Sequence, residues 1–381
     1  MKVLITGSLG FVGKNLVSTL EYMDEFEILT FNRADDISVL EKHSKVCDFV
    51  VHLAGVNRPE KISDFYTGNV DLVSTLISFL KKHNNKAPIL VSSSIQAELD
   101  NDYGKSKKAG EDVLIEYGKE VKSEVLIYRL PNLFGKWTRP FYNSVVATWA
   151  HQISRDEEVE ISNPDNVLHL VYIDDLVKEI IAALNMQANK VVDNYYSVPI
   201  SYKISLGELL DLFKSFRESR NTRFIANMKD DLTSKLYSTY LNYLPRDKFS
   251  YPLVTHSDKR GSFSEFIKSD YAGQVSINVS TAHQIKGEHW HHSKNEKFLV
   301  VKGKASIKFR DIFEKEVVEY IVSDKKLEVV DIPTGYTHNI TNLSKEDLIT
   351  IMWVNEPYNP NNPDTFVKMV EEDQEGLWKK C

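Results

Sequence analysis

The first part of the chain alternates between short apolar runs and amphipathic stretches. The apolar runs predict buried strands, because helices cover both faces of a parallel sheet. They occupy residues 3–6, 27–31, 49–53, 89–92 and 125–130. The stretches with helical spacing of apolar residues are clearest at residues 69–82 and 103–117. This alternation predicts a doubly wound α/β fold with a parallel sheet, whose ligands bind at the carboxyl ends of the strands.

After Pro252 the pattern changes from helical spacing to alternation of apolar and polar residues. Many short strands with glycine turns are typical of an antiparallel sandwich or barrel, so we predict an all-β second domain. Its strands are expected to begin near residues 274, 297, 305, 319, 327 and 349. Pro245 breaks the last amphipathic helix, at residues 231–244. We therefore predict domains at residues 1–245 and 246–381.

The composition is typical of a soluble globular enzyme. The 381 residues exceed what one hydrophobic core usually organises, which agrees with two domains. The net charge of -7 argues against nucleic acid as a partner, and no apolar run is long enough to span a membrane. Cys47 and Cys381 form neither a metal set nor a disulfide framework. No basic leader precedes the first strand, so we expect a cytoplasmic protein.

A glycine triplet, Gly7, Gly10 and Gly13, joins the first strand to the first helix. Glycines are needed there because the backbone turns sharply and a pyrophosphate must reach bare N–H groups at the helix N-terminus. The second strand ends in Asn32-Arg33, where an NAD enzyme usually carries a carboxylate that binds the ribose diol. An arginine can instead pair with a 2'-phosphate, which favours NADP(H), although a solvated loop arginine would give the same pattern.

Candidate acid/base residues follow the strand at residues 89–92. Serines close this strand, and Tyr103 and Lys107 lie four residues apart, on one face of a predicted helix. An ammonium one turn away stabilises a phenolate and so lowers the pKa of the phenol, and the pair then works as one acid/base unit. Ser94 can hydrogen-bond the oxygen of a carbonyl whose carbon gains or loses a hydride. By itself, Tyr-x-x-x-Lys also occurs by chance on many helices.

Together with further motifs, these residues resemble the extended short-chain dehydrogenases/reductases that act on nucleotide sugars. The further motifs are HLAG at His52, RLPNLFG at Arg129 and VYIDDLV at Val171. The resemblance implies catalytic roles for Ser94, Tyr103 and Lys107. It places Gly7, Gly10, Phe11, Val12, Gly13, Asn32, Arg33, Leu53, Ala54, Gly55, Asn69, Tyr103 and Lys107 at the cofactor, and Arg129, Asn132 and Tyr172 at the sugar. The family often has Val-Tyr-Gly after its serines, and this chain has IQAELDN, so Ser93 competes with Ser94 for the hydroxyl role.

Histidines and a glutamate gather in the second domain at His289, His291, Glu296 and His338. Residues i and i+2 of a strand point to the same side, so His289 and His291 can face one cavity while His292 faces away. Three imidazoles and a carboxylate suit zinc, ahead of iron or manganese. The spacing resembles the paired motifs of the cupin (jelly-roll) family. The alternative is a set of histidines exposed on strands.

A closer resemblance is to the sugar-epimerase branch of the cupins, through DKRGSFSE from residue 258. It implies that Arg260 contacts the substrate, that His289 removes a proton beside a ketone, and that a late tyrosine, best matched by Tyr358, returns one. A histidine bound to a metal has no free lone pair. Either His289 is a ligand and the base lies elsewhere, or the other three residues hold the metal.

As a whole, the chain resembles the CapF family of bifunctional enzymes of capsular polysaccharide synthesis. The resemblance implies that the cupin domain, with zinc, epimerises C3 of a UDP-4-keto-2-acetamido-2,6-dideoxyhexose. The first domain then reduces C4 with NADPH to give UDP-2-acetamido-2,6-dideoxy-β-L-talose, on the route to UDP-N-acetyl-L-fucosamine. Epimerisation comes first, because a hydrogen beside a ketone is acidic enough for a side-chain base and one beside an alcohol is not.

Two other functions remain open from the sequence. One is a non-catalytic NADP-sensing regulator with a cupin ligand pocket, although a sensor has no need of a proton donor. The other is a nucleotide-sugar epimerase or dehydratase with tightly bound NAD. The sequence leaves open whether the nucleotide is UDP or dTDP. By analogy with both families, we expect a homodimer.

Overall fold

The computed structural model describes residues 1–59, 61–253, 255–258, 261–264, 267, 273–356 and 361–371. The chain divides into two compact units. The first comprises Met1–Ser144 and Val167–Ile204, and the second comprises Val145–Asn166 and Ser205–Cys381. The boundary that the sequence pattern predicts after residue 245 falls inside the second unit, because helices before it group with strands after it.

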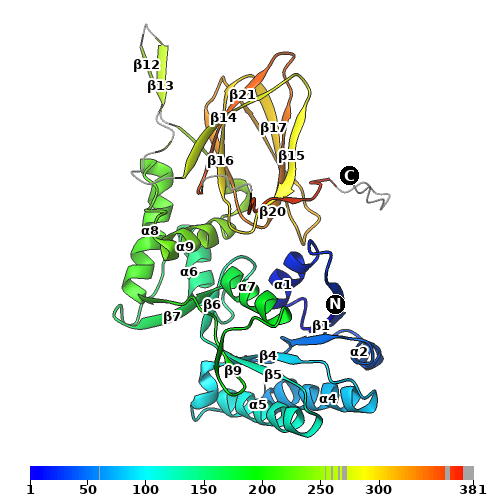
Figure 1. The fold of residues 1–381 in the computed structure, drawn as a ribbon. Coiled ribbons are helices and arrows are strands. Elements are labelled where there is room, and N and C mark those ends of the chain that lie inside the picture. The colour runs from blue at the N-terminus through cyan, green and yellow to red at the C-terminus, as the bar shows by residue number, and fades with distance from the viewer. Residues whose placement is uncertain are drawn as a thin grey trace. The chain divides into compact units, whose positions relative to one another are not determined.

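A seven-stranded sheet forms the centre of the first unit (Figure 1). Its order is β2 (Glu27–Phe31), β1 (Lys2–Thr6), β3 (Phe49–His52), β4 (Ile89–Ser94), β5 (Val125–Leu130), β9 (Tyr195–Tyr196) and β8 (Lys190–Val192). All neighbours are parallel except β8, which runs antiparallel to β9. The predicted parallel α/β sheet is confirmed. The strand order reverses between β1 and β3, where such sheets open a crevice for ligands.

Helices cover both faces of this sheet. In Figure 1, α4 (Leu72–Lys82) and α5 (Asp102–Val121) lie on one face, and α1 (Phe11–Leu20) and α7 (Ile173–Leu184) on the other. α2 (Ile37–Ser44) contacts α4. Further elements are α3 (Ser63–Tyr66), a π-helical turn (Thr67–Asp71), a 3-10 helix (Ile95–Glu98), and the short sheet of β10 (Tyr202–Ser205), β7 (Val167–Tyr172) and β6 (Asn132–Phe134). One core cluster holds fully buried residues of strands and helices: Leu4, Val50, Leu76, Leu114 and Ile127.

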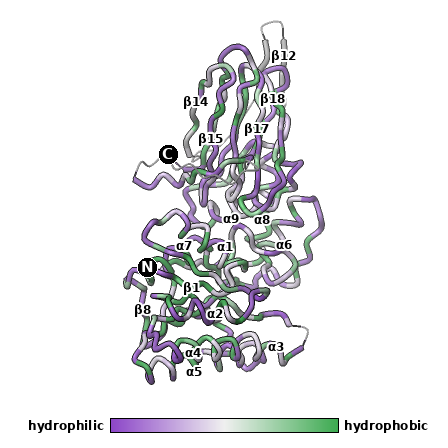
Figure 2. The backbone as a smooth tube through the Cα atoms, turned by 90° about the vertical axis from the view of Figure 1, so that its right-hand side faces the viewer, coloured by the Kyte–Doolittle hydropathy of each residue, from purple (hydrophilic) through white to green (hydrophobic). Residues whose placement is uncertain are grey.

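Two five-stranded antiparallel sheets form most of the second unit. One has the order β11 (Ser250–Pro252), β19 (Glu328–Ile332), β16 (Glu296–Lys302), β21 (Leu348–Val354) and β14 (Gln274–Ser280). The other has the order β18 (Val318–Ser323), β17 (Lys304–Asp311), β20 (Tyr336–Asn342), β15 (Ile285–Trp290) and β22 (Phe366–Val367). A separate hairpin pairs β12 (Thr255–Asp258) with β13 (Gly261–Ser264). The predicted antiparallel region is confirmed, and hydrophilic and hydrophobic residues follow one another along β17 in Figure 2.

The described residues of the second unit also form the α-helices α6 (Val145–Ile153), α8 (Leu206–Thr222) and α9 (Asp231–Asn242) and a 3-10 helix (Arg246–Lys248). Buried charges join α8 to the strands, because the fully buried Asp331 pairs with both Arg220 and Lys297. Removing one partner of a buried ion pair costs about 3–5 kcal/mol, so this network resists separation of the helices from the sheets. Among the described residues, no helix combines the length and apolar character that crossing a membrane requires.

Candidate active sites

A cavity of about 730 Å³ lies in the first unit, at the carboxyl ends of β1, β3 and β4. Its lining includes most of the predicted cofactor residues: Gly7, Gly10, Phe11, Val12, Gly13, Leu53, Gly55, Asn69, Tyr103 and Lys107. Ala54 borders a small adjoining space together with Asn69 and Lys107. The structure therefore brings these residues to the edge of the sheet where doubly wound folds bind ligands.

The glycine loop leaves no room for side chains. Gly7 has a φ of +73°, and a Cβ on it would lie 2.8 Å from the backbone nitrogen of Ala54. A Cβ on Gly13 would lie 2.3 Å from the carbonyl oxygen of Gly7. Helix α1 starts after this loop without a side-chain cap, so its first N–H groups are available to an anionic ligand.

The end of β2 is tied to the same loop. The Oδ1 atom of Asn32 accepts hydrogen bonds from the Ser8 hydroxyl (3.1 Å) and the Leu9 N–H (3.0 Å). Arg33 follows as an exposed residue, and neither it nor Asn32 belongs to the cavity lining. The assignment of Arg33 to a 2'-phosphate stays a prediction.

Tyr103 and Lys107 lie in the first turns of α5, which Asn101 caps by accepting the Gly104 N–H at 2.8 Å. Burial raises the pKa of Tyr103, and a hydrogen bond with Ser94 opposes this shift. From the sequence, Lys107 is instead predicted to lower this pKa. Burial of the phenol therefore decides the direction of the shift, while the Lys107 ammonium donates to the Ser92 carbonyl at 2.7 Å. Burial lowers the pKa of Lys107 to about 8, and the charge of Glu111 opposes that shift.

The two candidate serines have different partners. The Ser93 hydroxyl donates to Glu111 Oε1 at 2.5 Å and is buried, whereas Ser94 hydrogen-bonds Tyr103. Successive side chains of a strand point to opposite faces, which separates the two hydroxyls. Glu111 is itself held by Arg129, whose Nη2 lies 2.6 Å from Glu111 Oε2. The geometry therefore supports Ser94 as the hydroxyl that acts with Tyr103.

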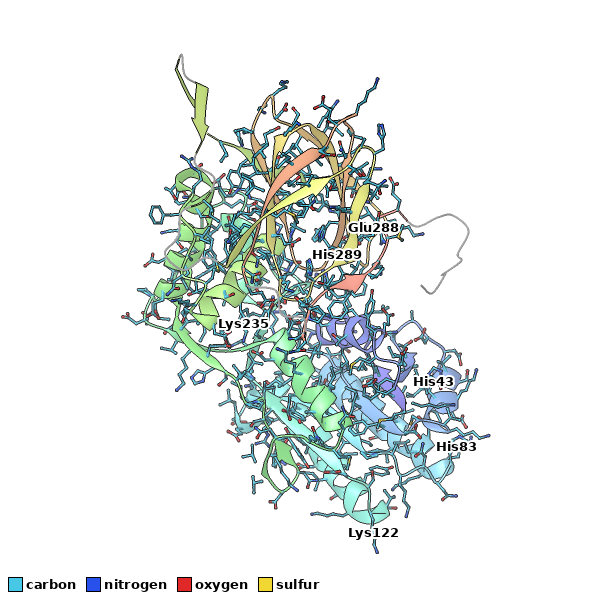
Figure 3. The ribbon with its side chains drawn as sticks, turned by 45° about the horizontal axis from the view of Figure 1, so that its top comes forward. His43, His83, Lys122, Lys235, Glu288 and His289 are labelled. Atoms are coloured by element: carbon cyan, nitrogen blue, oxygen red, sulfur yellow. The ribbon has the colours of Figure 1, made fainter. Side chains whose placement is uncertain are left out.

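The second unit contains a cluster of four possible metal ligands: His289, His291, Glu296 and His338. One ligand atom from each lies within 4.8 Å of all the others. His289 on β15 pairs directly with His338 on β20, and Glu296 begins β16 in the other sheet. The two sheets therefore face each other across this cluster. Figure 3 shows the place of His289 on β15, next to Glu288.

The cluster has the charge and the unpaired atoms that a cation would need. Glu296 Oε2 lies 3.3 Å from His338 Nε2 and 3.6 Å from His291 Nε2. These three buried atoms have no hydrogen-bond partner among the described residues. Burial lowers the pKa of His289 to about 4, with a further contribution from the two other imidazoles. Burial alone would raise the pKa of Glu296, but the imidazoles of His291 and His338 outweigh it and lower that pKa.

A neutral imidazole and an ionised carboxylate are the forms in which these side chains bind metals, and the shifts at His289 and Glu296 favour them. At His291, burial alone would lower the pKa, but the Glu296 carboxylate outweighs it and raises that pKa, so a metal would have to displace a proton there. A divalent cation among the ligand atoms would satisfy the three unpaired ones together, so the residues fit a metal.

The comparisons with known proteins agree with this two-part organisation. Residues 3–198 match the NAD dependent epimerase/dehydratase family, and residues 256–366 match the polysaccharide biosynthesis C-terminal domain. The chain belongs to the NAD dependent epimerase/dehydratase family. It is 43% identical, over 98% of its length and 100% of the relative, to the UDP-2-acetamido-2,6-beta-L-arabino-hexul-4-ose reductase of Pseudomonas aeruginosa.

Two solved structures extend this comparison. The capsular polysaccharide assembling protein CapF from Staphylococcus aureus is 48% identical, with a TM-score of 0.66 over 97% of this chain and 100% of that one. The predicted resemblance to the CapF family is confirmed. A UDP-glucuronic acid 4-epimerase from Bacillus cereus in complex with NAD is 19% identical over 56% of this chain and 83% of that one, with a TM-score of 0.50. That likeness shows a common fold alone.

The predicted sugar-binding residues of this family member lie in different places. Asn132 lines the cavity, but Arg129 and Tyr172 do not. The guanidinium of Arg129 is held by Glu111 and, at 2.7 Å, by Glu98, while Tyr172 is buried. Arg260 and Tyr358 lie outside the described residues. The roles in substrate binding and catalysis that the resemblance gives these residues stay predictions.

One part of the cavity wall was not predicted from the sequence. Its residues are Trp137, Thr138, Arg139, Tyr142, Asn143 and Ser144. Trp137 and Phe141 have left-handed backbones, with φ of +67° and +57°, a conformation that non-glycine residues adopt at a cost and often at functional sites. The position of this segment in the sequence could have indicated its role, since it directly follows the RLPNLFG motif at the end of β5.

Proposed function

We propose that the first unit reduces the C4 ketone of a UDP-linked 2-acetamido-2,6-dideoxy-4-ketohexose. The observation that carries this proposal is the cavity that joins the glycine loop to Ser94, Tyr103 and Lys107. The full-length relative from Pseudomonas aeruginosa is named as a reductase of such a UDP-hexulose, which supports the choice of substrate. An exposed arginine after β2 favours NADPH as the cofactor.

Each side chain has a definite task in this reduction. NADPH, when bound, supplies the hydride that adds to C4. Ser94 donates a hydrogen bond to the C4 oxygen, and Tyr103 gives its proton to that oxygen as it becomes an alkoxide. The Lys107 ammonium stabilises the resulting phenolate. The products are the C4 alcohol and the oxidised cofactor, and the phenol regains its proton from water.

We further propose that the second unit is a cupin that inverts C3 of the same sugar before the reduction. The hydrogen on C3 is acidic only while C4 is a ketone, and the reduction then makes the inversion irreversible. The combined product is UDP-2-acetamido-2,6-dideoxy-β-L-talose, a precursor for capsular polysaccharide. The CapF protein of Staphylococcus aureus, named for capsular polysaccharide assembly, supports the link to capsular polysaccharide.

His289, His291, Glu296 and His338 would hold the metal, for which we propose zinc. A divalent cation at this position acts as a Lewis acid and can polarise a carbonyl oxygen. A metal ligand has no free lone pair, so His289 would then orient the site and another group would act as the base. If the other three residues hold the metal, His289 remains the base. A homodimer is our expectation for the assembly.

Two readouts on the full-length chain test the function. NADPH oxidation follows the reduction, and uptake of deuterium at C3 from heavy water follows the epimerisation. We expect Tyr103→Phe to lower the rate of NADPH oxidation by about 10²- to 10⁴-fold and to leave deuterium uptake intact. His289→Ala should abolish deuterium uptake, whether His289 is base or ligand.

Other outcomes would point to other functions. Deuterium uptake that survives His289→Ala would make the second unit a binding module. Catalytic turnover without net NADPH consumption would instead indicate an epimerase or dehydratase with tightly bound NAD. Cofactor binding without any turnover of the UDP-sugar would indicate a sensor.

A further inference from the structure

A C-terminal strap, defined here as residues 361–371, runs along the strand that carries His289. Within it, β22 pairs with β15, with Val367 opposite His289 and Phe366 opposite Trp290. The Phe366 ring lies 5.3 Å from the ring of Trp290. Further along, the Val370 N–H donates to Glu288 Oε2 at 2.7 Å. The strap therefore contacts the residues on both sides of His289 in the sequence.

Asp364 of this strap binds the loop that connects two of the possible metal ligands. This ligand loop, residues 292–295, joins His291 to Glu296. The Asp364 carboxylate accepts the N–H groups of His292 (3.0 Å), Ser293 (2.9 Å) and Lys294 (2.9 Å), and also the Ser293 hydroxyl (2.9 Å). A carboxylate that accepts successive backbone N–H groups holds them in one conformation. The distance between the two ligands thus depends on Asp364.

The backbone of Asp364 acts on His291 directly. Its carbonyl oxygen lies 2.5 Å from His291 Nδ1. A carbonyl can only accept, so this hydrogen bond requires the proton on Nδ1. In the neutral imidazole, which is the form that binds a metal, Nε2 then carries the lone pair, and it is this atom that faces Glu296 Oε2. The contact sets the tautomer in which a histidine binds a metal through Nε2.

Asp364 makes these contacts in an unfavourable backbone conformation. Its φ of +40° lies in the left-handed region, which aspartate adopts far less readily than glycine. Such a conformation persists when the surrounding contacts determine it. Here those contacts are the carboxylate with the ligand loop and the carbonyl with His291.

We propose that Asp364 is a positioning residue of the metal site, which holds His291 and the ligand loop in the arrangement that binds the cation. This inference rests on the metal site proposed above. No motif in the sequence points to Asp364, which lies 73 positions after His291. It acts through His291 and Glu296 and has no role as a ligand itself.

The release of zinc from the full-length chain tests the inference. Zn²⁺-loaded protein is mixed with a chromophoric chelator, and the release rate of Asp364→Asn is compared with that of the unmodified chain. The amide keeps one oxygen but loses the charge and an acceptor, while the backbone contact with His291 remains. Losing an outer partner of a metal site usually costs about 10- to 100-fold in metal affinity, so we expect zinc release to be faster by about the same factor. The visible spectrum of the Co²⁺-loaded variant should change as well, because it reports the coordination geometry.

Glu371→Gln is the matched control, since Glu371 lies on the same strap but pairs with Lys308, at 2.6 Å. It should leave both the zinc release rate and the Co²⁺ spectrum unchanged. An Asp364→Asn chain that unfolds at lower temperature but releases zinc at the unmodified rate would overturn the inference, because the strap would then be structural only.

A second variant tests the positioning role of Asp364 if Asp364→Asn does not fold. Ser293→Ala removes one of the four donors to the carboxylate and should still speed zinc release, whereas an unchanged rate overturns the inference. If the unmodified chain takes up no Zn²⁺, the proposed metal site fails together with the inference. Equal retention of Zn²⁺ by the unmodified and Asp364→Asn chains overturns the inference alone.

Discussion

The two candidate sites of this molecule are assembled in different ways. The reductive site takes Ser94, Tyr103 and Lys107 from adjoining elements, the end of β4 and the start of α5. The metal cluster takes His289 and His338 from paired strands of one sheet and Glu296 from the other sheet. A parallel α/β sheet brings its strand ends to one edge through topology alone. A pair of antiparallel sheets must instead set the register of each strand before its side chains meet.

A bulge shows how strongly the second site depends on register. The pairing of β15 with β20 shifts between Gly287 and His289, where Gly287 has a φ of +106° and Glu288 a φ of +57°. Because the side-chain period of a strand is two, one extra residue exchanges the face to which the following residues point. The bulge therefore decides that His289 faces His338.

The largest expected effect is a loss of reduction that leaves the metal cluster unchanged. Tyr103→Phe removes the proton donor and should lower the rate of NADPH oxidation by about 10²- to 10⁴-fold. Because the metal cluster shares no residue with the reductive site, zinc content should not change. Kinetics of NADPH oxidation and metal analysis of the same preparation check this. A loss of zinc in this variant would break the comparison, since the two sites would then depend on each other.

The next largest effect distinguishes the roles of the neighbouring residues Ser93 and Ser94. Ser94→Ala should lower the rate of NADPH oxidation by about 10²- to 10³-fold, the usual cost of removing one donor to a developing oxyanion. Ser93→Ala is the matched control and should cost far less, because the Ser93 hydroxyl is bound to Glu111. Steady-state kinetics of both variants decide between them. Equal losses would show that Ser93 also reaches the substrate.

A smaller effect is expected at the end of β2. Arg33→Ser removes the predicted partner of the 2'-phosphate and should reduce the preference for NADPH over NADH by about 10- to 100-fold, since a hydrogen bond to a charged group contributes about 1.5–3 kcal/mol. The ratio of kcat/KM for the two cofactors is the measurement. An unchanged ratio would mean that Arg33 is a solvated loop residue.

The smallest effect concerns pH. Lys107 has a pKa of about 8, below which its ammonium is present and above which it is lost, so the rate of reduction should fall as the pH rises through this range. The charge of Glu111 opposes the lowering of the Lys107 pKa. Tyr103 and the buried His52 are also titratable and lie near Lys107, and burial keeps His52 neutral by lowering its pKa. In Glu111→Gln the alkaline limb should therefore move to lower pH, with a loss at pH 8 of about 2- to 10-fold.

Glu98→Gln provides the control for this shift. Glu98 binds the same Arg129, but its side chain is 70% exposed, whereas that of Glu111 is 1% exposed. The pH profile of Glu98→Gln should match that of the unmodified chain. A shared shift in both variants would assign the effect to Arg129 and not to the charge of Glu111.

The sequence by itself determined the parts of this protein that depend on local pattern. Apolar runs and helical spacing predicted the strands β1 to β5 and the helices α4 and α5, because a buried strand and an amphipathic helix each have their own period. The glycine loop was predictable because its backbone excludes side chains. The four possible ligands were predictable because few residue types bind transition metals.

Only the tertiary structure decided what depends on packing between distant segments. Ser93 and Ser94 are equivalent in sequence, and the buried Glu111 distinguishes them. The bulge before His289 and the capture of the ligand loop by Asp364 join residues far apart in the chain. The grouping of α8 with the sheets rests on the buried charge of Asp331. Local patterns record which face of an element is buried, whereas these contacts depend on which other element covers that face.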